Sequence, residues 1–300
     1  MQTVAAGILQ DIEGRVFVQQ RKDGRWEFPG GKSEKGESPM QTLARELAEE
    51  TGITTKDATP WLRRALPDAG IVLHFFRVNQ WRGIPRGCEG QECYFCHLDA
   101  PPEPMLAANI PVWKWLKLPP LCAITAAELM GVEESLKSMK NAFTNGLRLV
   151  QLRDKNLPPQ IRRSFAEQAA AMARKHKAIL LINDDETLAR DINADGVHLS
   201  SVKLAEAKCR PDFAWAAASC HNSAQLQMAA SLNLDFAVLS PVAKTLTHVD
   251  AAPMGWNGFA KLAANTGIPV YALGGLSKTD IQTARRHNAQ GAALMRKAWQ

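Results

Sequence analysis

The chain has 300 residues, 46% of them hydrophobic, which suggests about two domains with ample apolar core. No apolar run reaches the roughly 18 residues of a transmembrane helix, and the start lacks the basic region of a signal peptide, so we expect a cytoplasmic protein. The net charge is +6, but the chain contains no dense Lys/Arg run, so we do not expect nucleic-acid binding. Binding of small phosphorylated ligands explains the excess of basic residues equally well.

The first part of the chain is predicted to be rich in strands. Short apolar or alternating runs, several of them bounded by turn residues, are typical of strands. They lie at residues 4–9, 15–21, 70–78 and 92–98.

One helix is predicted among these strands, beginning at Pro39 and ending at Thr51. Ser38 is a favourable N-cap, Pro39 suits the first helical position, and Gln41 completes a capping box. Gly52 then terminates the helix.

Three cysteines crowd the segment GCEGQECYFCH, at positions 88, 93 and 96. A zinc site is one interpretation of this spacing. The segment also predicts a strand, in which residues three apart point to opposite faces, so we favour reduced structural thiols.

The segment PVWKWLKLPPL separates two halves, which we place at residues 1–117 and 118–300. Beyond it, eight short apolar runs alternate with helical patterns. Such a βα repeat within about 180 residues predicts a (β/α)8 barrel of the TIM type. Since the chain stops soon after the eighth run, we expect the barrel to lack its last helix.

The predicted helix carries Glu46, Glu49 and Glu50 side by side, although like charges at this spacing repel each other. A solvated acidic helix face is one explanation. A bound divalent cation is another, because Mg²⁺ prefers oxygen ligands and binds phosphates at the same time. Glycines before the helix would let the main chain approach closely, and such a cation could activate water for attack on phosphorus.

Gly31, Glu37 and the run Arg45 to Ile53 follow the complete Nudix signature. This part of the chain resembles the Nudix hydrolases, and among them the MutT type of 8-oxo-dGTP diphosphatase. The resemblance implies an α/β/α sandwich with a mixed sheet, a Mg²⁺ or Mn²⁺ cofactor and a nucleoside triphosphate substrate. It also implies that Glu46 is the general base and that Arg45 holds a glutamate in place.

The resemblance extends beyond the signature. EFPGG before the helix, W-x-G-x-P-x-G-x-E-G-Q at residues 81–91 and Asn109 before a later proline match MutT segments. These matches imply metal ligands at Gly30, Glu46, Glu49, Glu50 and Glu89, and substrate contacts from Arg21, Glu27, Phe28, Pro29, Gly30 and Asn109. Asn109 would read the oxidised purine through its amide, although a turn residue before proline is the plainer interpretation.

The second half resembles thiamine-phosphate synthases and the related thiazole tautomerase TenI. LVQLRDK, the Asn183-Asp184 pair, ADGVHLS with His198 and the turns at 240–242 and 273–276 match that family. The resemblance implies a ligand site at the carboxyl ends of the strands, with Asp184 near Mg²⁺. Its residues are Gln151, Arg153, Lys155, Asn183, Asp184, Ser219, His221, Thr245, Gly274 and Gly275.

Two positions depart from the synthase pattern. Lys203 stands where a second metal-binding aspartate is expected, and His248 replaces a phosphate-binding lysine. An ammonium group cannot bind Mg²⁺, although it can offset phosphate charge. We therefore favour a degenerate barrel that binds a phosphorylated thiazole or pyrimidine or supports the other half, over an active synthase or a tautomerase using His221.

The leading functional hypothesis is an enzyme that removes oxidised nucleotides from the nucleotide pool and so protects DNA replication. The alternative is a thiamine-pathway protein whose Nudix half cleaves related pyrophosphates. The purine-type context of Asn109 favours the first, because a pyrimidine specialist would not need it.

Overall fold

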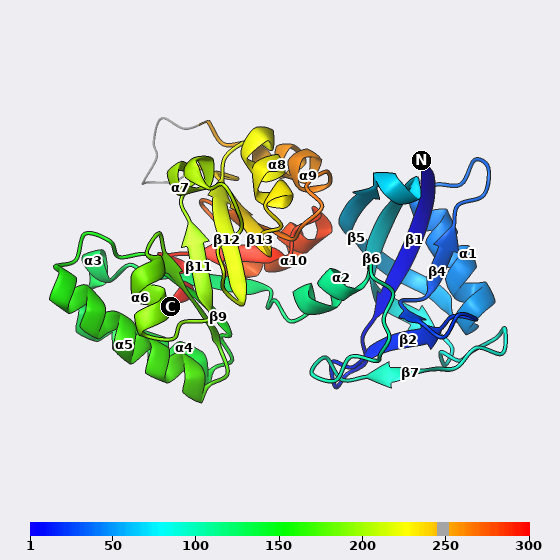
Figure 1. Ribbon diagram of the computed structural model, residues 1–300, viewed down its shortest axis with the longest axis horizontal. Coiled ribbons are helices and arrows are strands. Elements are labelled where there is room, and N and C mark those ends of the chain that lie inside the picture. The colour runs from blue at the N-terminus through cyan, green and yellow to red at the C-terminus, as the bar shows by residue number, and fades with distance from the viewer. Residues whose placement is uncertain (245–251) are drawn as a thin grey trace. The chain divides into compact units, whose positions relative to one another are not determined.

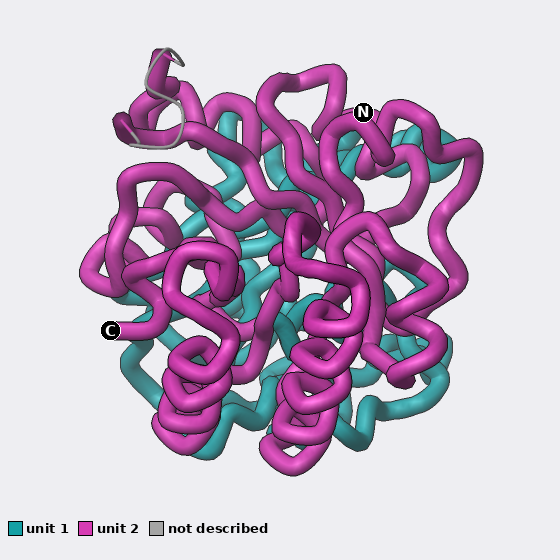
Figure 2. The backbone as a smooth tube through the Cα atoms, turned by 90° about the vertical axis from the view of Figure 1, so that its left-hand side faces the viewer, with its two compact units in different colours: residues 1–118 teal, residues 119–300 magenta. Residues whose placement is uncertain are grey.

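The computed structural model describes residues 1–244 and 252–300 and divides the chain into two compact units, Met1–Leu118 and Pro119–Gln300 (Figures 1 and 2). Within these described ranges, no helix combines the length and apolar character that crossing a bilayer requires. Each unit has its own sheet system and core, so each is described by itself.

The first unit contains a mixed four-stranded sheet in the order β4-β1-β6-β5 and a smaller sheet in the order β3-β2-β7. In the larger sheet β1 and β6 are parallel, while β4 and β5 lie antiparallel at its edges. The elements of this unit are β1 (Gln2–Leu9), β2 (Val16–Gln20), β3 (Trp26–Glu27), β4 (Gly30–Lys32), α1 (Pro39–Thr51), β5 (Thr54–Leu66), η1 (Pro67–Ala69), β6 (Ile71–Arg82), β7 (Cys93–Cys96) and α2 (Ile110–Trp115).

Helix α1 has the predicted bounds and caps. The Ser38 hydroxyl accepts from the backbone N–H of Gln41, and the Gln41 side chain accepts from the Ser38 backbone N–H, which completes the capping box. At the other end Gly52 adopts φ 70°, a left-handed conformation that costs glycine little. The ends of this helix are therefore fixed by local sequence.

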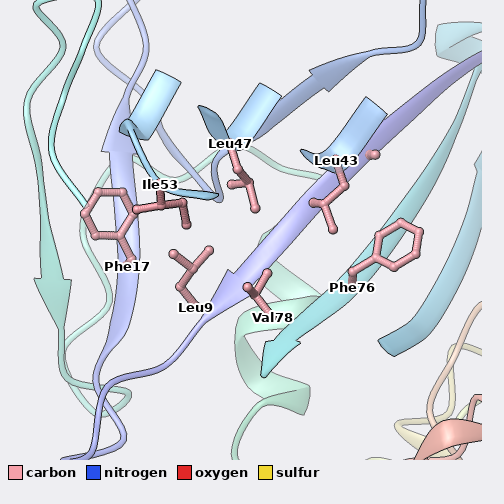
Figure 3. Close-up of a cluster of buried hydrophobic side chains, with 8 residues drawn as sticks. Leu9, Phe17, Leu43, Leu47, Ile53, Phe76 and Val78 are labelled. Carbon is pink, nitrogen blue, oxygen red and sulfur yellow. The ribbon is translucent and has the colours of Figure 1, made fainter. Parts of the chain in front are cut away.

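The apolar side of α1 packs on the larger sheet. Leu43 and Leu47 are fully buried and point towards Leu9, Phe76 and Val78 on the strands (Figure 3). Burying each leucine contributes about 1.5–3 kcal/mol to stability. Because this stripe faces the sheet, the glutamates on another side of the helix are left for the site.

The opposite face of the same sheet carries α2. Successive strand residues alternate between faces, so Phe75 points away from the side that Phe76 shares with α1. Phe75 meets Phe28, which in turn stacks on Trp113 of α2 at a centroid distance of 6.0 Å. Helix, sheet and helix form three layers, as the predicted α/β/α sandwich requires.

Strand β5 is an element that the sequence patterns did not predict. Its residues Thr54–Leu66 pair only with β6, along an edge, and the register shifts at three points. Pro60 lies within the strand, where an edge position tolerates the missing N–H donor. These interruptions hide the alternation that normally reveals a strand.

The second unit is a closed barrel of eight parallel strands. All eight strands that the sequence predicted are present, and β8 closes the barrel against β15. Its elements are β8 (Leu121–Ile124), α3 (Ala127–Met130), α4 (Val132–Thr144), β9 (Leu149–Leu152), α5 (Pro159–Lys175), β10 (Ile179–Asn183), α6 (Glu186–Asp191), β11 (Gly196–Leu199), α7 (Ser201–Glu206), β12 (Trp215–Cys220), α8 (Ser223–Ser231), β13 (Phe236–Leu239), α9 (Gly255–Ala263), β14 (Val270–Leu273), η2 (Lys278–Asp280), α10 (Ile281–Arg286), β15 (Gly291–Leu294) and η3 (Arg296–Ala298).

The end of the barrel differs from a complete βα repeat, as predicted. After β15 the described residues form only the short η3, so no α-helix follows the eighth strand among them. The indole N–H of Trp299 donates to the carbonyl of Ile124 at 3.0 Å, so the chain end is anchored at the carboxyl end of β8.

Candidate functional site

The carboxylate of Glu50 connects α1 to the Gly30-Gly31 turn. Its Oε2 accepts hydrogen bonds from the Gly30 backbone N–H at 2.7 Å and from the Gln19 amide at 2.8 Å. Burial, helped by the nearby Glu27 and Glu46 carboxylates, raises the pKa of Glu50 to about 7. This half-buried acid is therefore held between strand and helix in a site that disfavours its negative charge.

Glu46 lies directly against Gly31. A Cβ atom added at Gly31 would lie 2.4 Å from the Glu46 carboxylate, and one added at Gly30 would lie 2.1 Å from the Ala5 carbonyl oxygen. Only glycine at both positions permits this close approach of main chain and acid. Burial raises the pKa of Glu46 as well.

Arg45 joins the acids of the site through a network of charged hydrogen bonds. Its guanidinium donates to Glu37 at 2.8 and 3.0 Å, and to Glu46 and Glu49 at 3.0 Å each. A further bond reaches the carbonyl of Lys32 at 3.0 Å. The bonds from Arg45 lower the pKa of Glu37 to about 2, so Glu37 serves to hold the arginine.

The acids of the site are held by other contacts. Among residues 1–244 and 252–300, no group of three His, Cys, Asp or Glu side chains is arranged to hold a metal ion. Arg45 donates to Glu46 and Glu49, and the backbone N–H of the exposed Glu89 donates to Gln91. The donor chemistry nevertheless fits Mg²⁺ or Mn²⁺, because Glu46 and Glu50 are oxygen donors whose mutual repulsion a cation would relieve.

Two glutamines support this site, and the sequence did not predict their roles. Gln19 is only 3% exposed and follows three apolar residues on β2, and a polar residue at an inward position was the available signal. Gln91 donates to the Glu50 carbonyl at 2.9 Å and accepts from the Glu89 N–H at 2.8 Å. Gln91 therefore ties the Glu89 loop to the end of α1.

Arg21 and Glu27 form a pair beside the acids. Arg21 donates to Glu27 at 2.9 Å and to Asp23 at 3.4 Å, and 42% of its side chain is exposed. Burial raises the pKa of Glu27, while Arg21 counteracts this effect. Phe28 and Pro29, the next predicted substrate contacts, are both buried, and the Pro29 carbonyl accepts from Gly7 at 2.9 Å.

Asn109 is buried at the start of α2 with 4% of its surface exposed. Its backbone is fixed, because its N–H donates to Leu106 and its carbonyl accepts from Trp113, both at 2.8 Å. Its side chain makes no capping hydrogen bond to the helix, so its amide is not committed to the helix start. An amide carries both donors and an acceptor, which suits the recognition of a ligand.

The barrel residues gather at the carboxyl ends of β9 and β10. Gln151 donates to Asn183 across these strands at 2.8 Å, and both are buried. Asp184 adopts φ 57° and accepts from the Ser200 N–H at 2.6 Å. Arg153 and Lys155 follow β9 and are exposed. These four positions and Asn183 therefore surround one end of the barrel, where its chemistry belongs.

Two histidines lie at this end in different surroundings. His198 is fully buried, burial lowers its pKa to about 4, and its Nε2 bonds to Ser219 at 2.9 Å. His221 is exposed, and its Nδ1 lies 3.0 Å from the Ser240 carbonyl oxygen. Ser219 and His221 thus contact different neighbours.

The predicted phosphate turns lie side by side. Val242 and Ala243 donate from their N–H groups to Leu273 at 2.9 Å and Gly274 at 3.0 Å. A Cβ at Gly274 would lie 2.9 Å from Pro241 Cα, so glycine is needed for this approach. Gly275 follows with φ 69°. Thr245 and His248 lie outside the described residues.

Lys203, which departs from the synthase pattern, forms an ion pair within α7. Its ammonium group donates to Glu206 at 2.8 Å, and this bond raises the pKa of Lys203, with Asp184 adding to the effect. The charged side chain near Asp184 is therefore a cation, and the first turn of α7 contains no acidic residue.

The six cysteines of the chain are all free thiols. Cys93 is half-buried and Cys96 is buried on β7, and burial raises the pKa of both. A raised pKa leaves less of the thiolate form and so makes these thiols less reactive.

The chain matches two known families in succession. Residues 1–116 match the family described as NUDIX domain, and residues 121–298 match the family described as Thiamine monophosphate synthase. The 8-oxo-dGTP diphosphatase of Escherichia coli (strain K12) is 38% identical over 119 residues, which are 35% of this chain and 92% of that protein.

The barrel has relatives of two lengths. A protein of Aquifex aeolicus (strain VF5) is 34% identical over 181 residues, which are 59% of this chain and 96% of that relative. The thiamine-phosphate synthase of Synechococcus sp. (strain WH7803) is 32% identical over 168 residues, and the chain spans 48% of that longer protein.

A solved structure shares the barrel fold. Thiamine phosphate pyrophosphorylase from Pyrococcus furiosus matches with a TM-score of 0.51 and 23% identity, covering 60% of this chain and 89% of that one. Taken with the family matches, these similarities show that the chain belongs to the Nudix family of hydrolases acting on phosphoric anhydrides through its first unit and to the thiamine monophosphate synthase family through its second.

Proposed function

We propose that the first unit is a Mg²⁺- or Mn²⁺-dependent pyrophosphohydrolase that converts 8-oxo-dGTP to 8-oxo-dGMP and pyrophosphate. The observation that supports it most is the arrangement of Glu46 and Glu50 against the Gly30-Gly31 turn. Two half-buried acids that repel each other form a site in which a cation and a diphosphate stabilise each other. The name of the Escherichia coli relative supports the choice of nucleotide.

Each residue of the turn and helix has a proposed role. Glu46, Glu49 and Glu50, with the Gly30 carbonyl and Glu89, would hold the cation, which supplies charge stabilisation to the diphosphate when bound. Glu46 accepts the proton of the attacking water, and its raised pKa suits a base. Arg45 keeps the Glu46 carboxylate in place. The water oxygen forms a bond to phosphorus, the bond between this phosphorus and the oxygen of the leaving group breaks, and pyrophosphate departs.

The base end of the substrate has a separate set of proposed contacts. The amide of Asn109 offers an acceptor and two donors and does not cap the helix, which supports a role in reading an oxidised purine. Arg21 would contact the phosphates or sugar after exchanging its bond to Glu27. Phe28 and Pro29, which are both buried, would provide apolar contacts to the base.

A substrate panel tests the nucleotide assignment. The full chain is assayed with MgCl₂ against 8-oxo-dGTP, dGTP, ADP-ribose and thiamine diphosphate, and kcat/KM is compared. We expect 8-oxo-dGTP to be preferred, with the monophosphate and pyrophosphate as products. A clear preference for ADP-ribose would end the nucleotide-sanitation proposal.

We propose further that the barrel is a module that binds a phosphorylated ligand without the full synthase reaction. The ion pair of Lys203 with Glu206 supports this view, because a cation stands beside Asp184 where a second metal-binding acid is expected. The competing candidate is thiamine-phosphate synthase or thiazole tautomerase activity. The retained Gln151–Asn183 pair and the glycine turn at Gly274 favour that candidate.

These two candidates for the barrel are separated by product analysis. The full chain is incubated with thiazole phosphate and pyrimidine pyrophosphate substrates, and products are identified by mass spectrometry. We expect binding without turnover. Robust formation of thiamine phosphate would establish the synthase instead.

A further inference from the structure

Arg64 on the edge strand β5 is half-buried, yet none of the carboxylates in the described ranges forms an ion pair with it. Burial lowers its pKa, and no acidic neighbour counteracts this effect. Removing a cation from water without an opposite charge is unfavourable. The contacts that do hold this guanidinium therefore indicate what it does.

Both contacts of Arg64 lie in the segment that carries Asn109. Its Nη1 donates to the Ala108 carbonyl at 3.0 Å, and its guanidinium carbon lies 5.2 Å from the ring centre of Trp115 in α2. One arginine thus contacts the residue before Asn109 and the helix after it. Arginine suits this double contact, since its planar group bonds a carbonyl while covering an aromatic ring.

The Ala108 carbonyl and the Asn109 N–H belong to one rigid peptide plane. Arg64 holds the oxygen of this plane, and Leu106 accepts from its N–H at 2.8 Å. On the other side of Asn109, the carbonyl is fixed by Trp113. The backbone on both sides of Asn109 is therefore fixed, while its side chain is not used to cap the helix.

We propose that Arg64 is a positioning residue that holds the Asn109 amide in the orientation that reads the purine base. This inference rests on the proposed function, because it assumes that Asn109 contacts the base. Nothing in the sequence patterns pointed to Arg64, since β5 itself was not predicted. Its role follows from the contacts of one half-buried cation with the segment before and after Asn109.

A kinetic cycle tests this role. Arg64→Met removes the charge and hydrogen bond while keeping much of the bulk, and Arg63→Met changes the neighbouring arginine, whose charge acts on His74 instead. We expect Arg64→Met to raise KM for the best purine triphosphate about tenfold with kcat within about twofold. Arg64→Lys should recover part of this loss, and Arg63→Met should leave KM unchanged.

The same cycle includes Asn109→Ala and a pyrimidine triphosphate. If Arg64 acts through Asn109, adding Arg64→Met to Asn109→Ala has no further effect on KM, and hydrolysis of dCTP is unaffected by Arg64→Met. An equal loss for purine and pyrimidine substrates, or a fall in kcat alone, would overturn the proposal.

A second readout needs no substrate. Hydrogen exchange followed by mass spectrometry should show faster exchange at residues 106–113 in Arg64→Met and no change in Arg63→Met. Unchanged exchange contradicts the positioning role. If the wild-type protein hydrolyses no purine triphosphate, the proposed function fails, while the exchange experiment still decides whether Arg64 fixes this segment.

Discussion

The two candidate sites differ in how their residues are brought together. The acids of the first unit come mainly from one short stretch, a glycine turn and the helix after it, and charged hydrogen bonds connect them directly. The barrel site collects strand ends that are spread from Gln151 to Gly275 in the sequence. A local site is preserved or lost as a whole, whereas a dispersed site can change residue by residue.

The chemical character of the two sites follows the same division. In the helix site, Glu46 and Glu50 have raised pKa values because burial and like charges act together. In the barrel, the contacts at the strand ends are largely between neutral groups, such as Gln151 with Asn183 and His198 with Ser219. The barrel thus retains its architecture after exchanging an expected acid for Lys203, since fold does not imply function.

The largest expected effect comes from removing the base of the helix site. Glu46→Gln should lower kcat for the preferred triphosphate about 10²–10⁴-fold, because the amide cannot accept the proton of the attacking water. Steady-state kinetics with MgCl₂ measure this loss. The exposed Glu34→Gln is the matched control and should keep full turnover.

Near-full turnover by Glu46→Gln would show that another glutamate is the base. The same experiment on Glu49, Glu50 and Glu89 would then identify it. Unchanged melting temperature is required in each case, since a loss of fold also lowers activity.

Gly31→Ala should have the next largest effect. The added Cβ would lie 2.4 Å from the Glu46 carboxylate and must displace it, so we expect kcat/KM to fall about 10–100-fold. In the double variant with Glu46→Gln, the glycine change should add little further loss, because both act on one carboxylate. Kinetics of both single variants and the double variant measure this.

Gly258→Ala in α9 is the control for this glycine change. A Cβ there would meet only the Met254 side chain, at 3.2 Å. Full activity in Gly258→Ala and a strong loss in Gly31→Ala would show that the loss comes from the site and not from replacing any glycine with alanine. Independent, additive losses from Gly31→Ala and Glu46→Gln would contradict the proposed contact.

The parts of the fold that local rules govern could be predicted from sequence. Ser38, Gln41 and Gly52 fix the ends of α1 through bonds within a few residues, so its bounds were predictable. The barrel strands are continuous apolar runs separated by helices and were equally clear. Strand β5 escaped prediction because Pro60 and its irregular register break the alternation of a half-buried strand.

The candidate sites show the same limit. Glu46, Glu49 and Glu50 share one helix, so their spacing alone places them together. Gln19 reaches Glu50 from a strand 31 positions earlier, and Arg64 reaches Ala108 across 44 positions. Such contacts depend on tertiary packing, which no short pattern in the sequence records.

Glu50→Gln should change stability with pH in a defined direction. The folded pKa of Glu50 is raised from 4.5 to about 7, so the folded state holds this proton more tightly than the unfolded state. Its contribution to stability is fully present below about pH 4.5 and is lost as pH rises through about 7. Relative to the wild type, the free energy of unfolding of Glu50→Gln should therefore be about 1–2 kcal/mol higher at pH 8 than at pH 5.

Urea unfolding of the full chain in EDTA at the two pH values measures this difference. EDTA is needed because a bound cation would hold Glu50 in its charged form. The exposed Glu34→Gln should show the same pH dependence as the wild-type protein. If Glu50→Gln changes the free energy of unfolding by the same amount at both pH values, the charged form of Glu50 does not destabilise the folded state.

The smallest effect on stability, and the sharpest test of the barrel, is expected from Lys203→Asp. The ion pair with Glu206 has both partners about half exposed, at 52% and 58%, so its loss should change the free energy of unfolding very little. The new acid beside Asp184 should instead make pyrophosphate binding depend on Mg²⁺, whereas the wild-type lysine offsets phosphate charge without metal. Thermal shifts of both proteins with pyrophosphate, with and without Mg²⁺, measure this, because a ligand that binds the folded state raises its melting temperature. The exposed Lys208→Asp is the control, and a wild-type shift that already requires Mg²⁺ would show that Lys203 does not replace the metal's charge.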